Sequence, residues 1–171
     1  MFSLIIGGSG SGKSAFAESL VSRLSGRRIY LATMRSDGEE AFSRIARHRA
    51  QRRELAFETI ECPVNLAALD LPDNANVLLE DLGNLLANEL FSPQGGGAEQ
   101  ALRGIEALRL RCAHLAVVTN EVFSGGDRYE GETLRYLREL ALLNRSLAAE
   151  AELVAELVCG LPNLLKGELP A

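Results

Sequence analysis

The chain has 171 residues, a formal net charge of -5 and an isoelectric point near 5.2. Its length suits a single domain over residues 1–171, because a chain of this size buries about 70% of its unfolded surface without disulfides or metals. The acidic balance disfavours nucleic acid as a partner, since such proteins usually carry a basic surplus. With no run of about 18 apolar residues and no charged leader, we expect a cytoplasmic protein without a membrane span.

Apolar runs alternate with helical patterns along the chain. Strands are predicted at Phe2–Ile6, Arg28–Ala32, Phe57–Glu61, Asn76–Glu80, Leu115–Thr119 and Leu153–Cys159. Apolar residues at three- and four-residue spacing predict helices at Lys13–Leu24, Gly38–Leu55, Leu82–Phe91, Ala98–Cys112 and Glu130–Glu150. This alternation is typical of an α/β fold, in which helices cover both faces of a mainly parallel sheet.

The first predicted strand leads into Gly7-Gly8-Ser9-Gly10-Ser11-Gly12-Lys13-Ser14, which fits the phosphate-binding pattern G-x-x-x-x-G-K-S. Its glycines permit the backbone angles that turn successive N–H groups toward phosphate oxygens. Lys13 would neutralise the β and γ phosphates, Ser14 would offer its hydroxyl to Mg²⁺, and the next helix would point its N-terminus at the same anion. The segment predicts a nucleoside triphosphate site in a P-loop NTPase fold.

A second Mg²⁺ element is indicated by Val77–Asp81, an apolar strand that ends in two acidic residues. In phosphate-loop enzymes a carboxylate at this place holds the ion directly or through water. The alternative is an acidic cap on the helix that begins at Leu82. We favour Glu80 over Asp81 as the Mg²⁺ ligand, because Glu80 belongs to the end of the strand and Asp81 to the turn.

A local basic segment surrounds one of the two histidines. Arg44, His48 and Arg52 are spaced four apart, so they share a face of the predicted helix. Such a face suits polyphosphate, and a neutral imidazole there could act as a nucleophile while arginines stabilise charge on phosphorus. The pattern also fits a solvated basic helix face with a surface histidine, and the residues alone leave both interpretations open.

These motifs together resemble the adenosylcobinamide kinase/adenosylcobinamide-phosphate guanylyltransferase family. The resemblance runs in order through most of the chain, and its motifs are G-G-x-x-S-G-K-S, Ala17-Glu18, Tyr30–Thr33, Arg44-Ile45-x-x-His48-Arg49, Thr59–Glu61, Leu78–Glu80 and Val118–Val122. It implies a fold similar to the recombinase-type ATPases and an enzyme of cobalamin biosynthesis. The enzyme would phosphorylate adenosylcobinamide with ATP or GTP, and would then transfer GMP from GTP, through a histidine, to adenosylcobinamide phosphate.

The resemblance also implies roles for individual residues. His48 would be the guanylylated histidine and, with Lys13, would be catalytic. Residues Gly7 to Ser14 would hold the triphosphate, Ser14 and Glu80 the Mg²⁺, and the nucleotide would also contact Thr33, Arg52 and Glu61. The implied partners are nucleotides and a corrinoid, and the implied assembly is a homotrimer.

The chain departs from the family's pattern at several places. The family usually has arginine where this chain has Gly10, and tryptophan where it has Phe57. After Val122 the common G-x-G-x-V-P is replaced by Phe123–Gly131. Two alternatives therefore stay open: a small-molecule kinase without the histidine step, and a non-catalytic nucleotide-binding regulatory module of the same fold.

Overall fold

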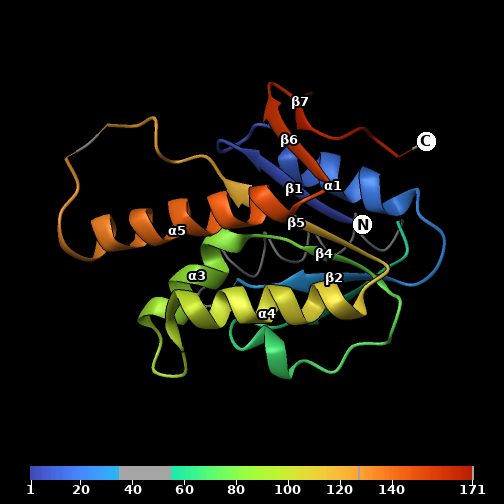
Figure 1. Ribbon diagram of the computed structural model, residues 1–171, viewed down its shortest axis with the longest axis horizontal. Helices are drawn as coiled ribbons and strands as arrows, with labels where there is room; N and C mark the ends of the chain where they lie inside the picture. Colours follow the sequence, from blue (N-terminus) through green and yellow to red (C-terminus); the bar gives the residue numbers. More distant parts are fainter. Residues whose placement is uncertain (35–54, 127, 171) are drawn as a thin grey trace, which may run out of the picture.

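The sheet is the framework of the molecule (Figure 1). In the computed structural model, which describes residues 1–34, 55–126 and 128–170, seven strands form one sheet in the order β3-β2-β4-β5-β1-β6-β7. The neighbours from β3 to β6 are parallel, and β7 is antiparallel to β6. The strands are β1 Phe2–Gly7, β2 Arg28–Ala32, β3 Phe57–Glu61, β4 Asn76–Leu79, β5 His114–Asn120, β6 Leu153–Val158 and β7 Leu161–Lys166.

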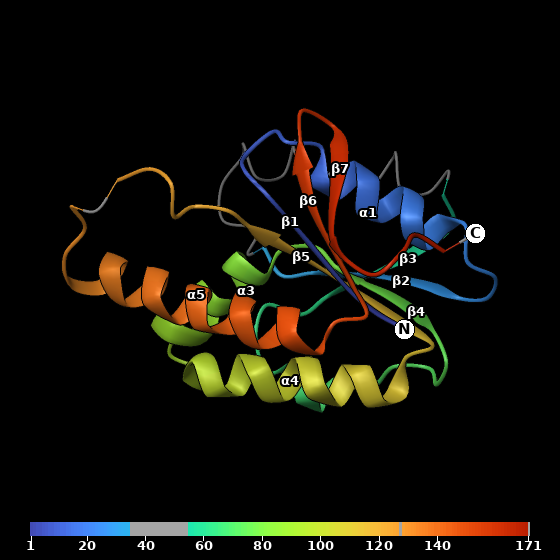
Figure 2. The ribbon, with the colours of Figure 1, turned by 45° about the horizontal axis from the view of Figure 1, so that its top comes forward.

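Helices cover both faces of the sheet (Figure 2). They are α1 Lys13–Ser22, α3 Leu82–Phe91, α4 Gly97–Arg111 and α5 Gly131–Glu150, with a short 3-10 helix, η1, at Leu66–Ala68. Helix α1 packs on one face, and α3, α4 and α5 form a layer on the other. The predicted α/β class is confirmed. None of the described helices has the length and apolarity needed to cross a membrane. The helix predicted at Gly38–Leu55 lies, apart from Leu55, outside the described residues.

The central strands are apolar at consecutive positions because both of their faces are covered. In β5, Leu115 and Val117 pack in the larger core under α3, α4 and α5, whereas Ala116 and Val118 pack in the smaller core under α1. All four side chains are at most 1% exposed. Continuous apolar runs of this kind are expected in parallel strands buried on both faces, and they explain why the sequence predicted these strands correctly.

Strand β7 was not predicted. It follows a two-residue turn in which Cys159 has φ 51° and Gly160 has φ 80°. Two positive φ values are the mark of the type I′ turn that joins tightly paired antiparallel strands. Cys159 therefore belongs to this turn, and the predicted strand Leu153–Cys159 ends one residue earlier. All six residues of β7 are exposed, so the strand lacks the buried apolar pattern by which the other strands were recognised.

A buried carboxylate connects two loops beneath the larger core. Glu89 in α3 is 2% exposed. Its two oxygens accept hydrogen bonds from the backbone N–H of Asn65 at 2.6 Å and of Gly96 at 2.7 Å. Glu89 thus holds the chain before η1 and the chain before α4 against the end of α3.

We predict that Glu89→Gln lowers the free energy of unfolding by about 1–3 kcal/mol, because an amide NH₂ would face a backbone N–H and leave a buried donor unsatisfied. Urea unfolding followed by circular dichroism measures this change. Glu99→Gln on α4 is the control, since Glu99 is exposed and, among the residues that the structure describes, pairs with Arg103 one helical turn away. An equal effect of the two substitutions would contradict the structural role assigned to Glu89.

His114 begins β5 as a buried neutral imidazole. It is 3% exposed, and its Nε2 shares a hydrogen bond of 3.1 Å with the Ser3 hydroxyl on β1. Burial, assisted by the N-terminal ammonium, lowers the pKa of His114 to about 4, against the opposing effect of Glu152. The predicted strand began at Leu115, whereas the structure makes His114 the first residue of the strand, in a structural role.

We predict that His114 makes the folded state acid-sensitive. The unfolded chain binds a proton at His114 near pH 6.5 and the folded chain only near pH 4, so stability falls as the pH falls between these values. Urea unfolding at pH 7 and pH 4.5 should show up to about 3 kcal/mol of this loss in the wild type and a smaller loss in His114→Gln. The same pH dependence in both proteins would count against this assignment.

Candidate active site

The phosphate loop connects the central strand β1 to α1 and is held by its own hydrogen bonds. The N–H of Ser11 donates to the Gly8 carbonyl at 3.2 Å, and the Ser11 carbonyl accepts from the N–H of Gly160 at 2.8 Å. Lys13 Nζ donates to the same Gly8 carbonyl at 3.0 Å. The ammonium is therefore held over the loop, and its other two N–H donors remain for phosphate oxygens.

The loop's shape requires glycine at both of its ends. Gly12 has φ 92°, and a Cβ there would lie 3.1 Å from the Gly160 Cα. At Gly7 a Cβ would meet the Ser11 hydroxyl at 2.4 Å. Because Gly12 is the N-cap and has no side chain, it cannot satisfy the first N–H groups of α1, and no acidic side chain stands in the first turn. Those N–H groups remain available to an anion.

A cavity of about 370 Å³ opens beside the loop, lined by Gly8, Ser9, Gly10, Ser11, Glu121 and the segment 156–159. The buried hydroxyl of Ser11 has no hydrogen-bond partner within the described part of the chain. Glu156 was missed by the sequence analysis. Its signal was present, because Glu156 is the single charged residue in the apolar strand β6.

The two acidic residues after β4 have different surroundings. Asp81 is the N-cap of α3: its Oδ1 accepts from the N–H of Asn84 at 3.1 Å and from Asn120 Nδ2 at 2.9 Å. The capping alternative is therefore realised by Asp81. Glu80 is half-buried, and its carboxylate makes no hydrogen bond or ion pair with the residues that the structure describes. The strand was predicted to end at Glu80 but ends one residue earlier, at Leu79, so Glu80 lies just beyond it.

Other predicted site residues are spread along the same edge of the sheet. Thr33 is fully buried after β2, where its hydroxyl donates to the Asp81 carbonyl at 3.0 Å and its carbonyl accepts from Asn88 Nδ2 at 2.8 Å. Glu61 is exposed at the end of the outermost strand β3, four strands from β1 or roughly 19 Å across the sheet. His48 and Arg52 lie outside the described residues. The roles of these four residues in nucleotide binding stay predictions.

Tyr136 of α5 completes a polar cluster with Asp81 and Asn120, and the sequence analysis missed it. Gly83 in the first turn of α3 makes room for the cluster: a Cβ there would lie 2.7 Å from the Tyr136 hydroxyl and 3.0 Å from both Asn120 Nδ2 and Asp81 Oδ1. Burial and the nearby Asp81 carboxylate raise the pKa of Tyr136 to about 12, so the phenol stays protonated. The only sequence signal was an isolated glycine within a helical pattern, which often marks a close approach.

A phosphate-binding loop at the carboxyl end of a central parallel strand defines a P-loop nucleotide-binding fold. The family model for cobinamide kinase / cobinamide phosphate guanyltransferase matches residues 3–165, so the chain belongs to this family, as its motifs predicted.

Characterised relatives of similar length resemble the chain over nearly its whole length. It is 35% identical to the bifunctional adenosylcobalamin biosynthesis protein CobP of Pseudomonas aeruginosa, over 98% of this chain and 99% of that protein. It is 34% identical to the bifunctional adenosylcobalamin biosynthesis protein CobU of Escherichia coli K12, and 32% to the protein of the same name from Salmonella typhimurium. Both alignments cover 97% of this chain and 100% of the relative.

We predict that Gly12→Ala weakens GTP binding at least about tenfold. Alanine at φ 92° costs about 1–2 kcal/mol, and relief of the contact with Gly160 would shift the N–H groups that face the phosphates. Equilibrium dialysis with GTP measures the affinity. The matched control is Gly26→Ala, because Gly26 also has a positive φ, 102°, but lies in the turn between α1 and β2, where a Cβ would make only an ordinary contact of 3.7 Å with Asn76 Nδ2. Equal GTP affinity in both variants would show that the geometry of Gly12 is not required.

Proposed function

We propose that this chain catalyses both reactions of its family: phosphorylation of cobinamide by a nucleoside triphosphate, and transfer of GMP from GTP to cobinamide phosphate through His48. The observation that carries the proposal is the unbroken phosphate loop at the carboxyl edge of the sheet, with the Lys13 ammonium bonded to the Gly8 carbonyl, the N-terminus of α1 left uncapped by a side chain, and a cavity beside residues 8–11. Family membership over residues 3–165 supplies the substrate class.

In the kinase step, the aminopropanol hydroxyl of cobinamide would attack the γ-phosphorus. The bond between that phosphorus and the β–γ bridging oxygen breaks, the nucleoside diphosphate leaves, and the hydroxyl proton passes to solvent. The loop's N–H groups and Lys13 would stabilise the negative charge that develops on the phosphate oxygens. These groups are already in place, because hydrogen bonds within the loop hold them.

The donors at this edge fit Mg²⁺. Ser14 follows Lys13 in the first turn of α1, and Glu80 offers a carboxylate without a protein partner among the described residues. A hydroxyl and a carboxylate are hard oxygen ligands, and Mg²⁺ is usually held by one or two such groups together with substrate phosphates. When bound, the ion would neutralise charge on the phosphates. Asp81 is less suited, because its carboxylate already caps α3 and accepts from Asn120.

In the guanylyl step, an imidazole nitrogen of His48 would attack the α-phosphorus of GTP. The bond between the α-phosphorus and the α–β bridging oxygen breaks, and pyrophosphate leaves. A phosphate oxygen of cobinamide phosphate then attacks the same phosphorus and breaks the N–P bond, which restores His48. The covalent intermediate divides one difficult exchange into two in-line transfers.

Three further features belong to this proposal. Either ATP or GTP would donate the γ-phosphate, the assembly would be a homotrimer, and the enzyme would act in the cytoplasm. The first two are implied by the family resemblance of the sequence motifs, and the third is the expectation from the sequence's lack of a long apolar run.

Labelling with GTP tests the histidine step directly. Incubation of the purified protein with Mg²⁺ and GTP labelled at the α-phosphate should leave an acid-labile, alkali-stable GMP adduct on His48, located by peptide mass spectrometry. His48→Ala should lose the adduct and guanylyl transfer while it retains transfer of the γ-phosphate to cobinamide. The matched control is His114→Gln, a substitution of the chain's other histidine, which should label normally.

The outcomes separate the candidate functions. Undiminished labelling of His48→Ala would refute the role of His48. Transfer of γ-phosphate to cobinamide without any protein-bound label would favour the kinase-only alternative. Nucleotide binding without turnover of cobinamide would favour a non-catalytic module.

A further inference from the structure

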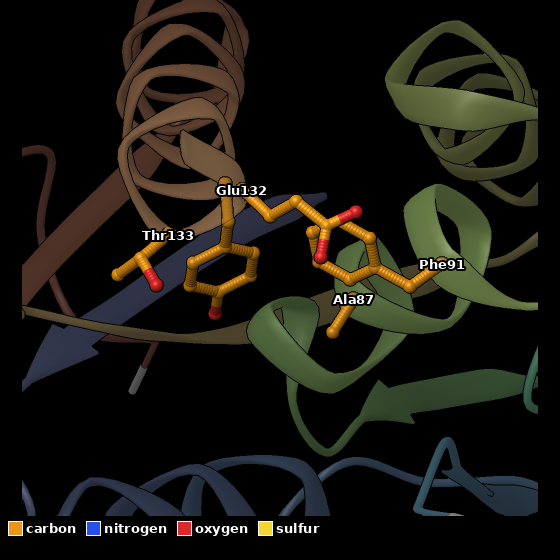
Figure 3. A pocket seen from close by; sticks show the side chains of 5 residues that line it. Ala87, Phe91, Glu132 and Thr133 are labelled. Carbon is orange, nitrogen blue, oxygen red and sulfur yellow. The ribbon is translucent and has the colours of Figure 1, made fainter. Parts of the chain in front are cut away.

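A second cavity, of about 300 Å³, lies between α3 and α5 (Figure 3). Ala87 and Phe91 line it from α3, and Glu132, Thr133 and Tyr136 line it from α5. Figure 3 shows the Glu132 side chain extending from α5 toward Phe91 and Ala87. The cavity is separate from the one beside the phosphate loop, with which it shares no lining residue.

A short path of neighbouring groups connects this cavity to the phosphate loop. Asn120 is the register partner of Gly7, the first residue of the loop. Its side chain donates to Asp81, and the Tyr136 hydroxyl lies beside both groups at Gly83. Tyr136 in turn lines the cavity. Since α3 rises ~1.5 Å per residue, Ala87 lies about 9 Å beyond Asp81 along the helix.

The chemistry of the wall indicates an amphiphilic ligand. Ala87 and the ring of Phe91 form an apolar side, while Thr133 and Glu132 supply a hydroxyl and a carboxylate that accept hydrogen bonds. Phe91 is 44% exposed at the rim. A volume of about 300 Å³ is at the lower limit for small-molecule sites. It suits one arm of a large molecule better than an entire macrocycle.

Two further aromatic residues are exposed in the connection that leads from β5 to α5. Tyr129, three residues before Glu132, is 41% exposed, and Phe123 in the same β5–α5 connection is 40% exposed. Exposing large aromatic side chains to water is unfavourable, and groups of them commonly mark a binding site. A corrin macrocycle has a broad apolar face and a periphery of amide arms, so it offers partners for both the rings and the carboxylate.

We propose that the cavity between α3 and α5 is the corrinoid subsite. It holds an amide-bearing arm of cobinamide, with the amide N–H groups donating to Glu132 and Thr133, while the aminopropanol arm reaches past Asn120 to the phosphate loop. The subsite rests on the proposed function, because cobinamide must be the acceptor. It assigns a substrate-specificity role to residues that lie on the opposite side of β5 from the nucleotide cavity.

Filling the cavity is the test. Ala87→Leu should raise the KM for cobinamide at least about tenfold, because the larger leucine side chain would occupy the space of the arm. Thr133→Val should raise this KM by a smaller factor, through loss of one hydrogen bond. In both variants the KM for GTP and the corrinoid-independent labelling by α-labelled GTP should stay unchanged. Ala149→Leu, the same substitution at an exposed position of α5, is the control.

Each result bears on the inference. A wild-type KM for cobinamide in both cavity variants, with the wild type active, overturns the subsite and leaves the proposed function intact. Absence of cobinamide turnover in the wild type overturns both. If circular dichroism shows that Ala87→Leu does not fold, Thr133→Val carries the test, because Thr133 is exposed and its substitution leaves the core untouched.

Discussion

The Asp81 carboxylate and carbonyl hold together the edge of the sheet on which the site depends. They join β2 through Thr33, β5 through Asn120 and the first turn of α3 through Asn84. Each partner is the end of an element, where backbone and side-chain groups would otherwise need water. Because Asp81 satisfies several of them at once, the carboxyl ends of β2, β4 and β5 stay aligned. The position of Asn120 beside the phosphate loop follows from that alignment.

Because Asp81 is used structurally, its neighbour Glu80 is the better candidate to bind a cation. The Asp81 Oδ1 already accepts from a helix N–H and a side-chain amide, which leaves one carboxylate oxygen for a cation, whereas neither oxygen of Glu80 has a partner among the described residues. In the proposed site, adjacent residues would divide the two functions that acidic groups commonly serve after a parallel strand: Asp81 caps the helix, and Glu80 would bind the metal. Which acid takes which function depends on where Asn120 and the α3 backbone lie.

Local patterns predicted most of the fold and the phosphate loop, and tertiary contacts account for what was missed. The strands β1, β4 and β5 were readable because burial on both faces makes them continuously apolar, and the loop because glycine, lysine and serine stand at fixed spacing. Strand β7 has neither pattern, and its two-residue turn uses Cys159 where asparagine or aspartate would have signalled a hairpin. Tyr136 reaches the site from 53 residues beyond Gly83, through packing of α5 on α3, which no spacing within the sequence encodes.

The end of β5 separates the two halves of the site. Consecutive residues of an extended chain point to opposite sides, and here Asn120 turns toward Asp81 and Tyr136 while Glu121 lines the cavity beside the phosphate loop. A nucleotide on the loop and an acceptor between α3 and α5 would therefore approach β5 from different sides and meet at its end. The two cavities share no lining residue. Substitutions in the corrinoid subsite can then alter acceptor affinity while the loop, and the GTP bound to it, remain unperturbed.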